Sequence, residues 1–324
     1  MERHDAGLSP ALIETIGGLA GGSVATLVVH PLDIVKTRMQ IHRSHAATSQ
    51  NLTTMSVIRG LTRAPHPVAA LYRGLTPNLL GNASSWASFF FFKRRIENAI
   101  LDVKGSARGD RASLSPRDYF LASGLAGMCT QVLTNPIWVL KTRMLSSDRG
   151  AAGAYPSMWA GAVQLVRTEG WRGLYRGLGI GLFGVSHGAV QFAVYDPLKK
   201  MYISRRRGRL GTEAAGMPVG GSQLMTNEAT LVLSSVSKLV AGAVTYPYQV
   251  IRSRLQNYNA EERFGRGIRG VIKRTWREEG IRGFYRGIIP GVVRVMPATW
   301  VTFLVYENTK FYLPRWAGHA EIDQ

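Results

Sequence analysis

Six long stretches with almost no charged residues constrain the fold of this chain more than any other feature of its 324 residues. Four of them contain no Asp, Glu, Lys or Arg: residues 16–32, 74–92, 119–140 and 177–195. The other two contain one charge each: Lys238 in residues 229–251 and Arg294 in residues 287–306. A helix that crosses a bilayer needs about 20 mainly apolar residues. The pattern therefore predicts an all-α membrane protein with six transmembrane helices.

The charge balance favours an anionic partner, because 40 Lys+Arg against 20 Asp+Glu give a formal charge of +20. Nucleic acid, anionic lipid and an anionic small molecule all fit such a surplus. A basic nucleic-acid-binding helical protein is the alternative from another class. The six apolar stretches argue against it, so we expect no nucleic acid partner. One cysteine, Cys129, excludes a disulfide framework and a Cys-based zinc site, and we expect no metal. The acidic, Ser and His residues show no catalytic arrangement, so we do not expect an enzyme.

Three sequence elements recur in phase along the chain. A Pro-x-x-x-x-basic-x-basic element occupies residues 31–38, 136–143 and 247–254. An aromatic-Arg-Gly element follows it at residues 72–74, 175–177 and 285–287. A Tyr-acidic element closes the second and third copies at residues 195–199 and 306–310. The phasing predicts one domain of three two-helix repeats at residues 11–112, 113–224 and 225–313, with tails at 1–10 and 314–324. Segments 158–168 and 268–277 predict short amphipathic helices at the membrane interface.

Together these motifs resemble the mitochondrial carrier family over nearly the whole chain. The resemblance implies six transmembrane helices with three-fold pseudosymmetry around one central site that works by alternating access. It also implies a monomer in the inner mitochondrial membrane, with both termini toward the intermembrane space. Residues 135–143 and 245–252 are similar to the carriers of FAD, folate, pyrimidine nucleotides and NAD. Residues 183–192 and 237–238 are most similar to the FAD/folate subgroup.

Helix geometry indicates which residues face the central pathway. Positions 7 and 11 residues before a pathway residue lie about two and three turns away on the same face. From Trp138 this places Gln131 on the pathway, and from Gln249 it places Lys238 there. A charge at mid-membrane costs about 2.5–3.5 kcal/mol even on lenient scales. We therefore expect Lys238 to contact substrate, the alternative being a structural bond to a neighbouring helix.

The resemblance implies three substrate contact points, nine residues after the tyrosines of the aromatic-Arg-Gly elements. In this sequence they are Gly81, Gly184 and Arg294. The planar fork of an arginine suits phosphate or carboxylate oxygens. We expect the two glycines to leave room for a flat ring. Three nearby residues complete the predicted site: Asn82 as a hydrogen-bonding group, and Trp86 and His187 as stacking partners. For Trp86 and His187, packing between helices is the alternative. Pro297 predicts a bend in the last span.

The resemblance also implies a matrix gate in which each acidic residue of a proline element pairs with a basic residue of the next repeat. Here only Asp33 and Lys141 form such a pair. We expect Trp138 to face Arg252 as a cation–π pair and Gln249 to face Lys36. The gate should thus be weaker than one with three ion pairs. Two further residues, Gln40 and Gln256, are expected to brace it.

A second gate is implied on the intermembrane-space side. Its residues in repeats two and three are Asp196, Lys199, Glu307 and Lys310. In repeat one the charges are inverted, with Arg94 and Glu97 at the acidic and basic positions. We therefore expect Asp196–Lys310 to be the one sound pair of this gate.

The predicted substrate is an anionic aromatic small molecule. FAD fits best, because its diphosphate suits Arg294 and Lys238 and its rings suit the aromatic residues. Folate follows, then NAD and pyrimidine nucleotides. FAD is expected as cargo, with no resident cofactor. Cardiolipin is expected at the helix starts at Gly74, Gly177 and Gly287, where free N–H groups can hold phosphate.

Extraction separates the two classes of function. Membranes that contain the chain are washed with high salt and then treated with detergent. A membrane-spanning protein stays in the pellet after the salt wash and dissolves only in detergent, because its apolar surface is solvated by lipid. Release by salt alone would instead indicate a nucleic-acid binder held by ionic contacts.

Overall fold

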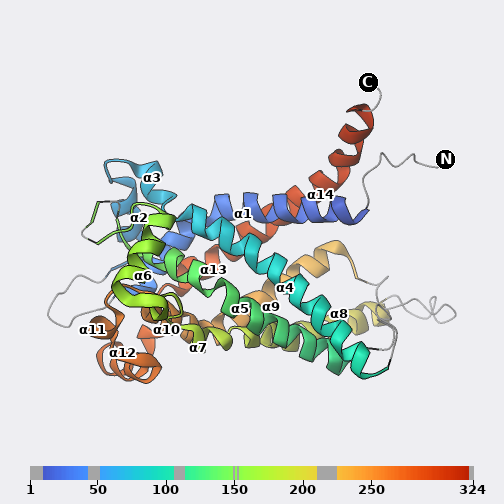
Figure 1. Cartoon of the computed structure of the whole chain (residues 1–324). Helices are drawn as coiled ribbons and strands as arrows, with labels where there is room; N and C mark the ends of the chain where they lie inside the picture. Colours follow the sequence, from blue (N-terminus) through green and yellow to red (C-terminus); the bar gives the residue numbers. More distant parts are fainter. Residues whose placement is uncertain are drawn as a thin grey trace.

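The computed structural model describes residues 10–42, 52–105, 114–148, 150–151, 153–209 and 225–320. Every regular element in these ranges is a helix, as predicted (Figure 1). The helices are α1 (Pro10–Ile41), α2 (Thr54–Thr62), α3 (Pro67–Leu71), α4 (Leu75–Val103), α5 (Pro116–Ser146), α6 (Met158–Leu174), α7 (Leu178–Leu182), α8 (Val185–Arg209), α9 (Asn227–Val244), α10 (Tyr246–Gln256), α11 (Ala260–Phe264), α12 (Gly267–Gly283), α13 (Ile288–Val293) and α14 (Val295–Ala320).

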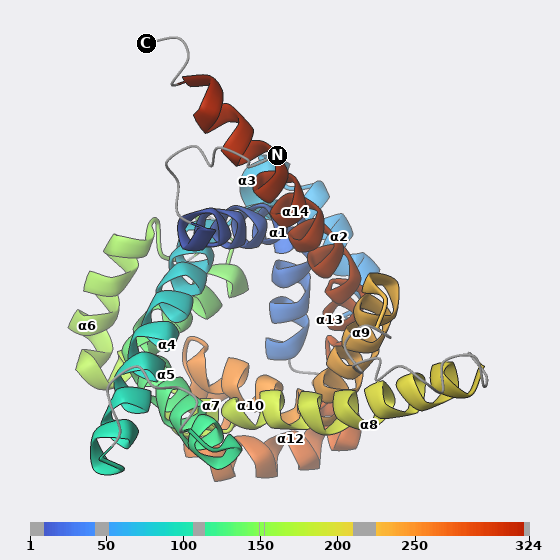
Figure 2. The same cartoon turned by 90° about the vertical axis from the view of Figure 1, so that its right-hand side faces the viewer.

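The long helices form a ring around an open centre when viewed from the end where both termini lie (Figure 2). Helix α1 packs along α14, α4 along α5, and α8 along α9, so the tightest neighbours come from different repeats. The shorter helices α2, α6 and α12 lie at the opposite end (Figure 1). We call that end the closed end, and the end with the termini the open end. Helices α6 and α12 contain the two predicted amphipathic segments.

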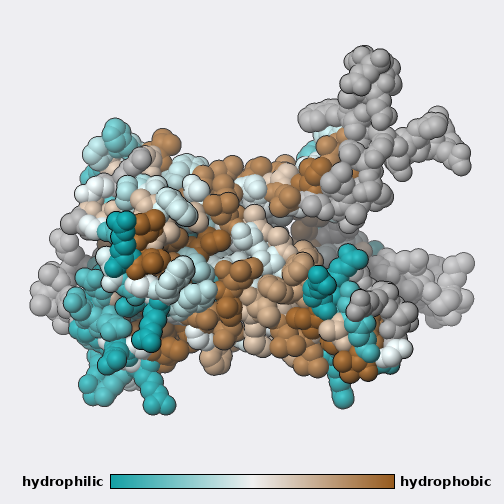
Figure 3. Space-filling model, viewed as in Figure 1, coloured by the Kyte–Doolittle hydropathy of each residue, from teal (hydrophilic) through white to brown (hydrophobic). Residues whose placement is uncertain are grey.

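The outer surface of the ring suits a bilayer. Hydrophobic residues gather over the middle of the molecule, with hydrophilic residues toward its ends (Figure 3). Among the described residues, three helical segments are long and apolar enough to cross a membrane, and the bent pair α9–α10 gives a fourth. Helices α4 and α5 have 29 and 31 residues but are more polar. Their inner faces bear residues such as Asn78, Asn82, Thr134 and Asn135, which lowers their mean hydropathy.

Prolines set the breaks in the last two spans. Pro247 cannot donate a backbone hydrogen bond, and the chain bends by 58° at Thr245, between α9 and α10. Pro297 has the same effect on the last span, which is interrupted at Arg294, between α13 and α14. Near Pro297 the helix is thus interrupted, but Ile288–Leu313 still forms one span, and the predicted bend stays a prediction. The interruption places the guanidinium of Arg294 at a helix break inside the ring.

The second basic residue of each proline element ties its repeat to the next. In each case the arginine Nε donates to the main-chain carbonyl of the residue nine positions after the next repeat's proline. The three bonds are Arg38 to Leu145 (3.2 Å), Arg143 to Gln256 (3.0 Å) and Arg254 to Gln40 (3.0 Å). Since the third bond returns to the first repeat, the set is cyclic and holds the closed end together.

The residue before each proline fastens the start of the next helix in its own repeat. Its side chain reaches a carbonyl of the aromatic-Arg-Gly element, although the three side chains differ chemically. The contacts are His30 Nε2 to Arg73 O (3.0 Å), Asn135 Nδ2 to Arg176 O (3.4 Å) and Tyr246 Oη to Arg286 O (3.0 Å). An imidazole, an amide and a phenol therefore make the equivalent contact in the three repeats.

The glycines of the aromatic-Arg-Gly elements are required by backbone geometry. Gly74, Gly177 and Gly287 have φ of 73°, 73° and 79°, a region that favours glycine. A side chain at Gly74 would meet Leu145 at 2.5 Å, and one at Gly287 would meet the Lys36 carbonyl at 2.9 Å. These glycines therefore let α4, α7 and α13 begin in close contact with the helix that carries the proline element of the next repeat.

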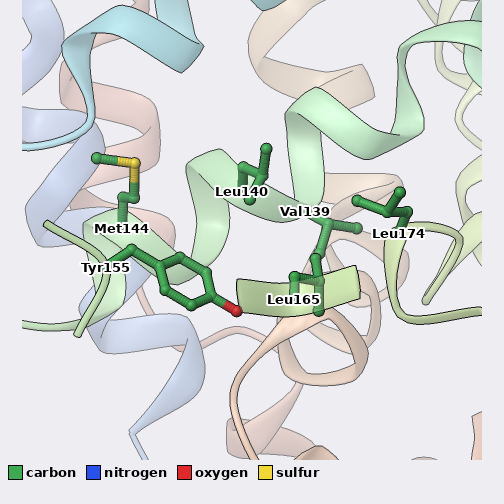
Figure 4. Close-up of a cluster of buried hydrophobic side chains, with 6 residues drawn as sticks. All are labelled: Val139, Leu140, Met144, Tyr155, Leu165 and Leu174. Atoms are coloured by element: carbon green, nitrogen blue, oxygen red, sulfur yellow. The ribbon is translucent and has the colours of Figure 1, made fainter. Parts of the chain in front are cut away.

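A buried apolar cluster seats α6 against the end of α5 (Figure 4). Its members are Val139, Leu140, Met144, Tyr155, Leu165 and Leu174. Beside it, Arg143 pairs with Glu169 at 2.5 Å, and in repeat three Arg254 pairs with Glu279 at 2.8 Å. The same acidic position is absent from repeat one, where Arg38 uses Asp148 of repeat two, a residue that is 70% exposed. At the closed end, repeat one therefore lacks the buried arginine–glutamate ion pair of the other two repeats.

Replacing Glu279 by Gln tests the buried ion pair. The Arg254 and Glu279 side chains are 1% and 3% exposed, and removing one partner of a buried pair costs about 3–5 kcal/mol. We expect a clear fall in the thermal unfolding midpoint of the purified protein in detergent. Glu278→Gln is the matched control, because its pair with Arg274 lies on the surface and contributes about 0.5 kcal/mol or less. Equal midpoints would show that the buried pair does not stabilise the closed end.

Candidate functional site

A cavity of about 580 Å³ occupies the centre of the ring. Its wall runs from Gly18 and Thr302 to Gln40 and Gln256 at the closed end. The long helices surround it in the view from the end where the termini lie (Figure 2). A side cavity of about 290 Å³ adjoins it between α8, α9, α13 and α14 and shares residues such as His187 and Arg294 with it. The centre can thus hold a solute that enters from the open end.

Six residues of the proline elements form the floor of the cavity, and we call them the gate layer: Asp33, Lys36, Trp138, Lys141, Gln249 and Arg252. Two of the predicted contacts are present. Lys141 Nζ lies 3.8 Å from Asp33 Oδ2, and Lys36 Nζ donates to Gln249 Oε1 at 2.9 Å. Each contact joins two repeats across the ring, which closes the floor.

The predicted cation–π pair between Trp138 and Arg252 is wrong. Lys141 Nζ lies 4.8 Å from the centre of the Trp138 ring instead. These two residues are three apart on α5, so their side chains share one face of the helix. The indole also packs against α4, where a side chain at Gly81 would meet it at 3.4 Å. Trp138 therefore fills the space beside Gly81.

Asp33 is the hub of the gate layer. Its carboxylate forms ion pairs with Lys141 and Arg294 and accepts a hydrogen bond from Asn78 Nδ2 at 3.3 Å. The same amide nitrogen lies 3.0 Å from His30 Nδ1. Because His30 Nε2 faces the Arg73 carbonyl, the neutral ring donates there and accepts from Asn78 at Nδ1. This buried chain fixes the carboxylate in place.

Sequence reasoning missed Asn78 and His30. A signal for Asn78 exists in the repeat, because it lies four residues after Gly74. The corresponding positions in the other two repeats are Gly181 and Gly291. The first repeat has an amide side chain at this position, whereas the other two repeats have glycine. Such a difference indicates a contact that is made in the first repeat alone. That contact is with Asp33, the one acidic residue of the gate layer.

Gln40 and Gln256 both make contacts between repeats below the gate layer. Gln40 Nε2 donates to Tyr246 Oη at 3.2 Å and accepts from Ser253 Oγ at 2.7 Å. Gln256 accepts from Thr142 Oγ1 at 2.9 Å. The structure therefore places the two expected braces where they can support the closed floor.

Four of the predicted substrate residues line the main cavity: Asn82, Trp86, His187 and Arg294. Trp86 is 62% exposed and stacks on Phe90 with ring centres 5.8 Å apart. Asn82 donates to Thr26 Oγ1 at 3.1 Å, and His187 Nδ1 lies 2.8 Å from Thr245 Oγ1. Lys238 lines the side cavity, together with His187 and Arg294. The wall thus combines the exposed indole of Trp86 with cationic groups.

The other three predicted substrate residues are not on the cavity wall, and the expected room beside the glycines is absent. The position beside Gly81 is filled by Ile137 and Trp138, at 3.3–3.5 Å. A side chain at Gly184 would lie 2.8 Å from the Gly181 carbonyl and 3.3 Å from Tyr248 Oη. Gln131 donates to Asn135 Oδ1 at 3.2 Å. The two glycines serve close packing, because the absence of a side chain lets Trp138 approach Gly81 and Tyr248 approach Gly184, whereas Gln131 bonds along its own helix α5.

The predicted pair between Asp196 and Lys310 is not formed. Within the described ranges Asp196 is exposed and makes no ion pair, and Lys310 Nζ lies 5.9 Å from the Tyr306 ring. Glu97 is buried and lies 3.8 Å from Lys93 of its own helix, while Arg94 is exposed. Two further predicted members, Lys199 and Glu307, also have no ion pair within these ranges. The pairing groups are apart because the ring is open at this end.

Comparison with known proteins agrees with this architecture. The family model described as mitochondrial carrier protein matches residues 8–104, 112–206 and 225–315. The mitochondrial FAD carrier protein FLX1 of Saccharomyces cerevisiae is 38% identical over 318 residues, covering 94% of this chain and 98% of the relative. Folate transporter 1, chloroplastic, of Arabidopsis thaliana is 33% identical (90% and 92% covered). Nicotinamide adenine dinucleotide transporter 1, chloroplastic, of the same plant is 31% identical (96% and 95% covered).

A double-mutant cycle tests the bond between Asp33 and Arg294. Asp33→Asn and Arg294→Gln should each lower the thermal midpoint in detergent. The double variant should lose less than their sum, with a coupling of about 0.5–3 kcal/mol, because the two groups are in contact. The control cycle pairs Asp33→Asn with Lys238→Gln, whose effects should add, since Lys238 lies in the side cavity. Additive effects for Asp33 and Arg294 would contradict the contact.

Proposed function

We propose that this chain, which belongs to the mitochondrial carrier family, moves FAD across the inner mitochondrial membrane by alternating access through its central cavity. Its relatives are named as transporters, and the family is one of carriers rather than enzymes.

The observation that carries the proposal is the chemistry of the cavity. Four cations line it, Lys36, Lys141, Arg252 and Arg294, against one acidic residue, Asp33. Such an excess of positive charge behind low-dielectric walls attracts anionic solutes. Trp86 presents an aromatic ring on the same wall, and this ring stacks on that of Phe90, which is not itself a lining residue. A solute with both a flat ring system and anionic groups suits this combination.

FAD meets these requirements through its two ring systems and its diphosphate. We assign the rings to the wall at Asn82 and Trp86, and the diphosphate to the region of Arg294 and Lys238. The relative named as a FAD carrier, at 38% identity, supports this choice. Folate is the second candidate, because it also joins a ring to carboxylates and a relative is named as a folate transporter. NAD and pyrimidine nucleotides follow.

The ion pairs of Asp33 suggest how the solute acts on the gate. Arg294 belongs to both the substrate wall and the gate layer, because its guanidinium pairs with Asp33. When a phosphate group binds Arg294, it draws the guanidinium away from Asp33. Lys141 then remains as the one cation paired with Asp33. Solute binding thus weakens the closed floor, which we place on the matrix side. Re-pairing of Asp33 with Arg294 restores the state open to the termini.

Cardiolipin and a monomeric state are part of the same proposal. The helices α4, α7 and α13 start after Gly74, Gly177 and Gly287, and the first N–H group of each donates to the tyrosine carbonyl three residues earlier, which leaves the N–H groups that follow for phosphate. Backbone N–H groups at helix starts favour phosphate. We place one lipid phosphate at each of the three starts.

Uptake into liposomes tests the transported solute. The purified protein is reconstituted, and labelled FAD, folate, NAD and UTP are offered in parallel. We expect saturable FAD uptake that Arg294→Ala abolishes, because the diphosphate loses its partner and Asp33 loses one of its two cations. Arg269→Ala is the matched control, since Arg269 is exposed on α12 and lies outside both cavities. Uptake of folate or a nucleotide without FAD would keep the family and reject FAD as the solute.

A further inference from the structure

Arg252 is the cation of the gate layer that lacks a partner. It lines the main cavity, but it makes no hydrogen bond and no ion pair with any residue that the structure describes. Its Nη2 atom is buried from solvent without a hydrogen-bond partner. A buried charge that is neither paired nor hydrogen-bonded is costly. Arg252 therefore needs an explanation that the other gate cations do not.

The sequence explains why the partner is missing. The acidic position of repeat two, from which a side chain could reach Arg252, is occupied by Trp138. That indole lies against Lys141 and the space beside Gly81, so it offers Arg252 no face. Lys36 loses its acidic partner in the same way but bonds to Gln249 at 2.9 Å. The substitution at position 138 thus leaves one uncompensated cation on the floor.

The structure also leaves space for the guanidinium. Arg252 Nε lies beside Gly181 of α7, where even an added Cβ would stand at 3.6 Å, an ordinary van der Waals distance, so α7 does not crowd the arginine. Asp33 cannot neutralise Arg252, because its carboxylate already holds Arg294, Lys141 and Asn78. Arg252 is therefore held at the cavity floor with donor groups that no protein acceptor uses.

We infer that Arg252 is an anion-binding residue at the floor of the cavity, and that its ligand is a phosphate or carboxylate group of the transported solute. This inference rests on the proposed function and adds to it a subsite below Arg294. The solute supplies the negative charge that the gate layer lacks at position 138. A neutral aromatic solute would leave Arg252 uncompensated, so the subsite also selects for charge.

Pyrophosphate binding to the purified full-length protein in detergent tests the subsite. The probe is inorganic pyrophosphate, with glutarate in parallel to separate phosphate from carboxylate recognition, and NaCl keeps the ionic strength constant. The apparent affinity is read from the rise of the thermal midpoint with ligand concentration. Arg252→Gln should weaken it about tenfold or more, because charged hydrogen bonds are lost. Arg269→Gln, which removes one exposed positive charge, should leave it unchanged.

A second measurement on the wild-type protein does not depend on the variant's folding. Phenylglyoxal modifies accessible arginines, and mass spectrometry reports the adduct at each site. Pyrophosphate should protect Arg252 and leave Arg269 unprotected. Absence of protection, or equal affinity of wild type and Arg252→Gln, overturns the subsite.

The subsite and the transported solute can fail separately. Protection of Arg252 by pyrophosphate without any FAD uptake keeps the subsite and rejects FAD. FAD uptake with an unchanged KM in Arg252→Gln keeps FAD and rejects the subsite. A raised KM for FAD in that variant, with normal uptake by Arg269→Gln, supports both.

Discussion

The shortage of negative charge at the centre of the ring governs the rest of this structure. Asp33 is the one acidic residue of the gate layer, and Lys141 and Arg294 share it. Every other cation on the floor must find a neutral partner or an external anion. Lys36 uses the amide of Gln249, whereas Arg252 has no protein acceptor. A cavity with this deficit is suited to an anionic solute, because the solute completes the ionic network instead of disturbing a finished one.

The cations of the gate layer are available for the solute because a separate set of hydrogen bonds joins the three repeats. The cyclic bonds of Arg38, Arg143 and Arg254 run to main-chain carbonyls, so they depend little on which side chains the next repeat carries. The contacts of His30, Asn135 and Tyr246 likewise end on carbonyls. The scaffold keeps three-fold symmetry while the gate layer departs from it. Asn78, opposite Gly181 and Gly291, belongs to that departure and serves Asp33 alone.

The sequence-based site was partly right, and its errors share one cause. The contact points implied by the family resemblance, with the residues near them, placed Asn82, Trp86, His187 and Arg294 correctly on the cavity wall. Sequence reasoning failed for Gly81, Gly184 and Gln131. Those positions also face inward, but a neighbouring helix reaches them before the cavity does. The distance between neighbouring helices is set by packing across repeats, which no single helix period contains. Trp138 lies in the gate layer as predicted, but its partner is Lys141 instead of Arg252 for the same reason.

The sequence by itself determined the helical membrane architecture, the three repeats and the proline, arginine and glycine elements. Each of these follows from local rules: span length, helix breaking and the backbone freedom of glycine. Only the tertiary structure decided which cation shares Asp33, that His30 and Asn78 stand behind it, and that Arg252 has no partner. It also decided that the gate near the termini is open, with Asp196 and Lys310 apart. These outcomes depend on how residues more than a hundred positions apart meet across the ring, and the spacing along one helix cannot specify that.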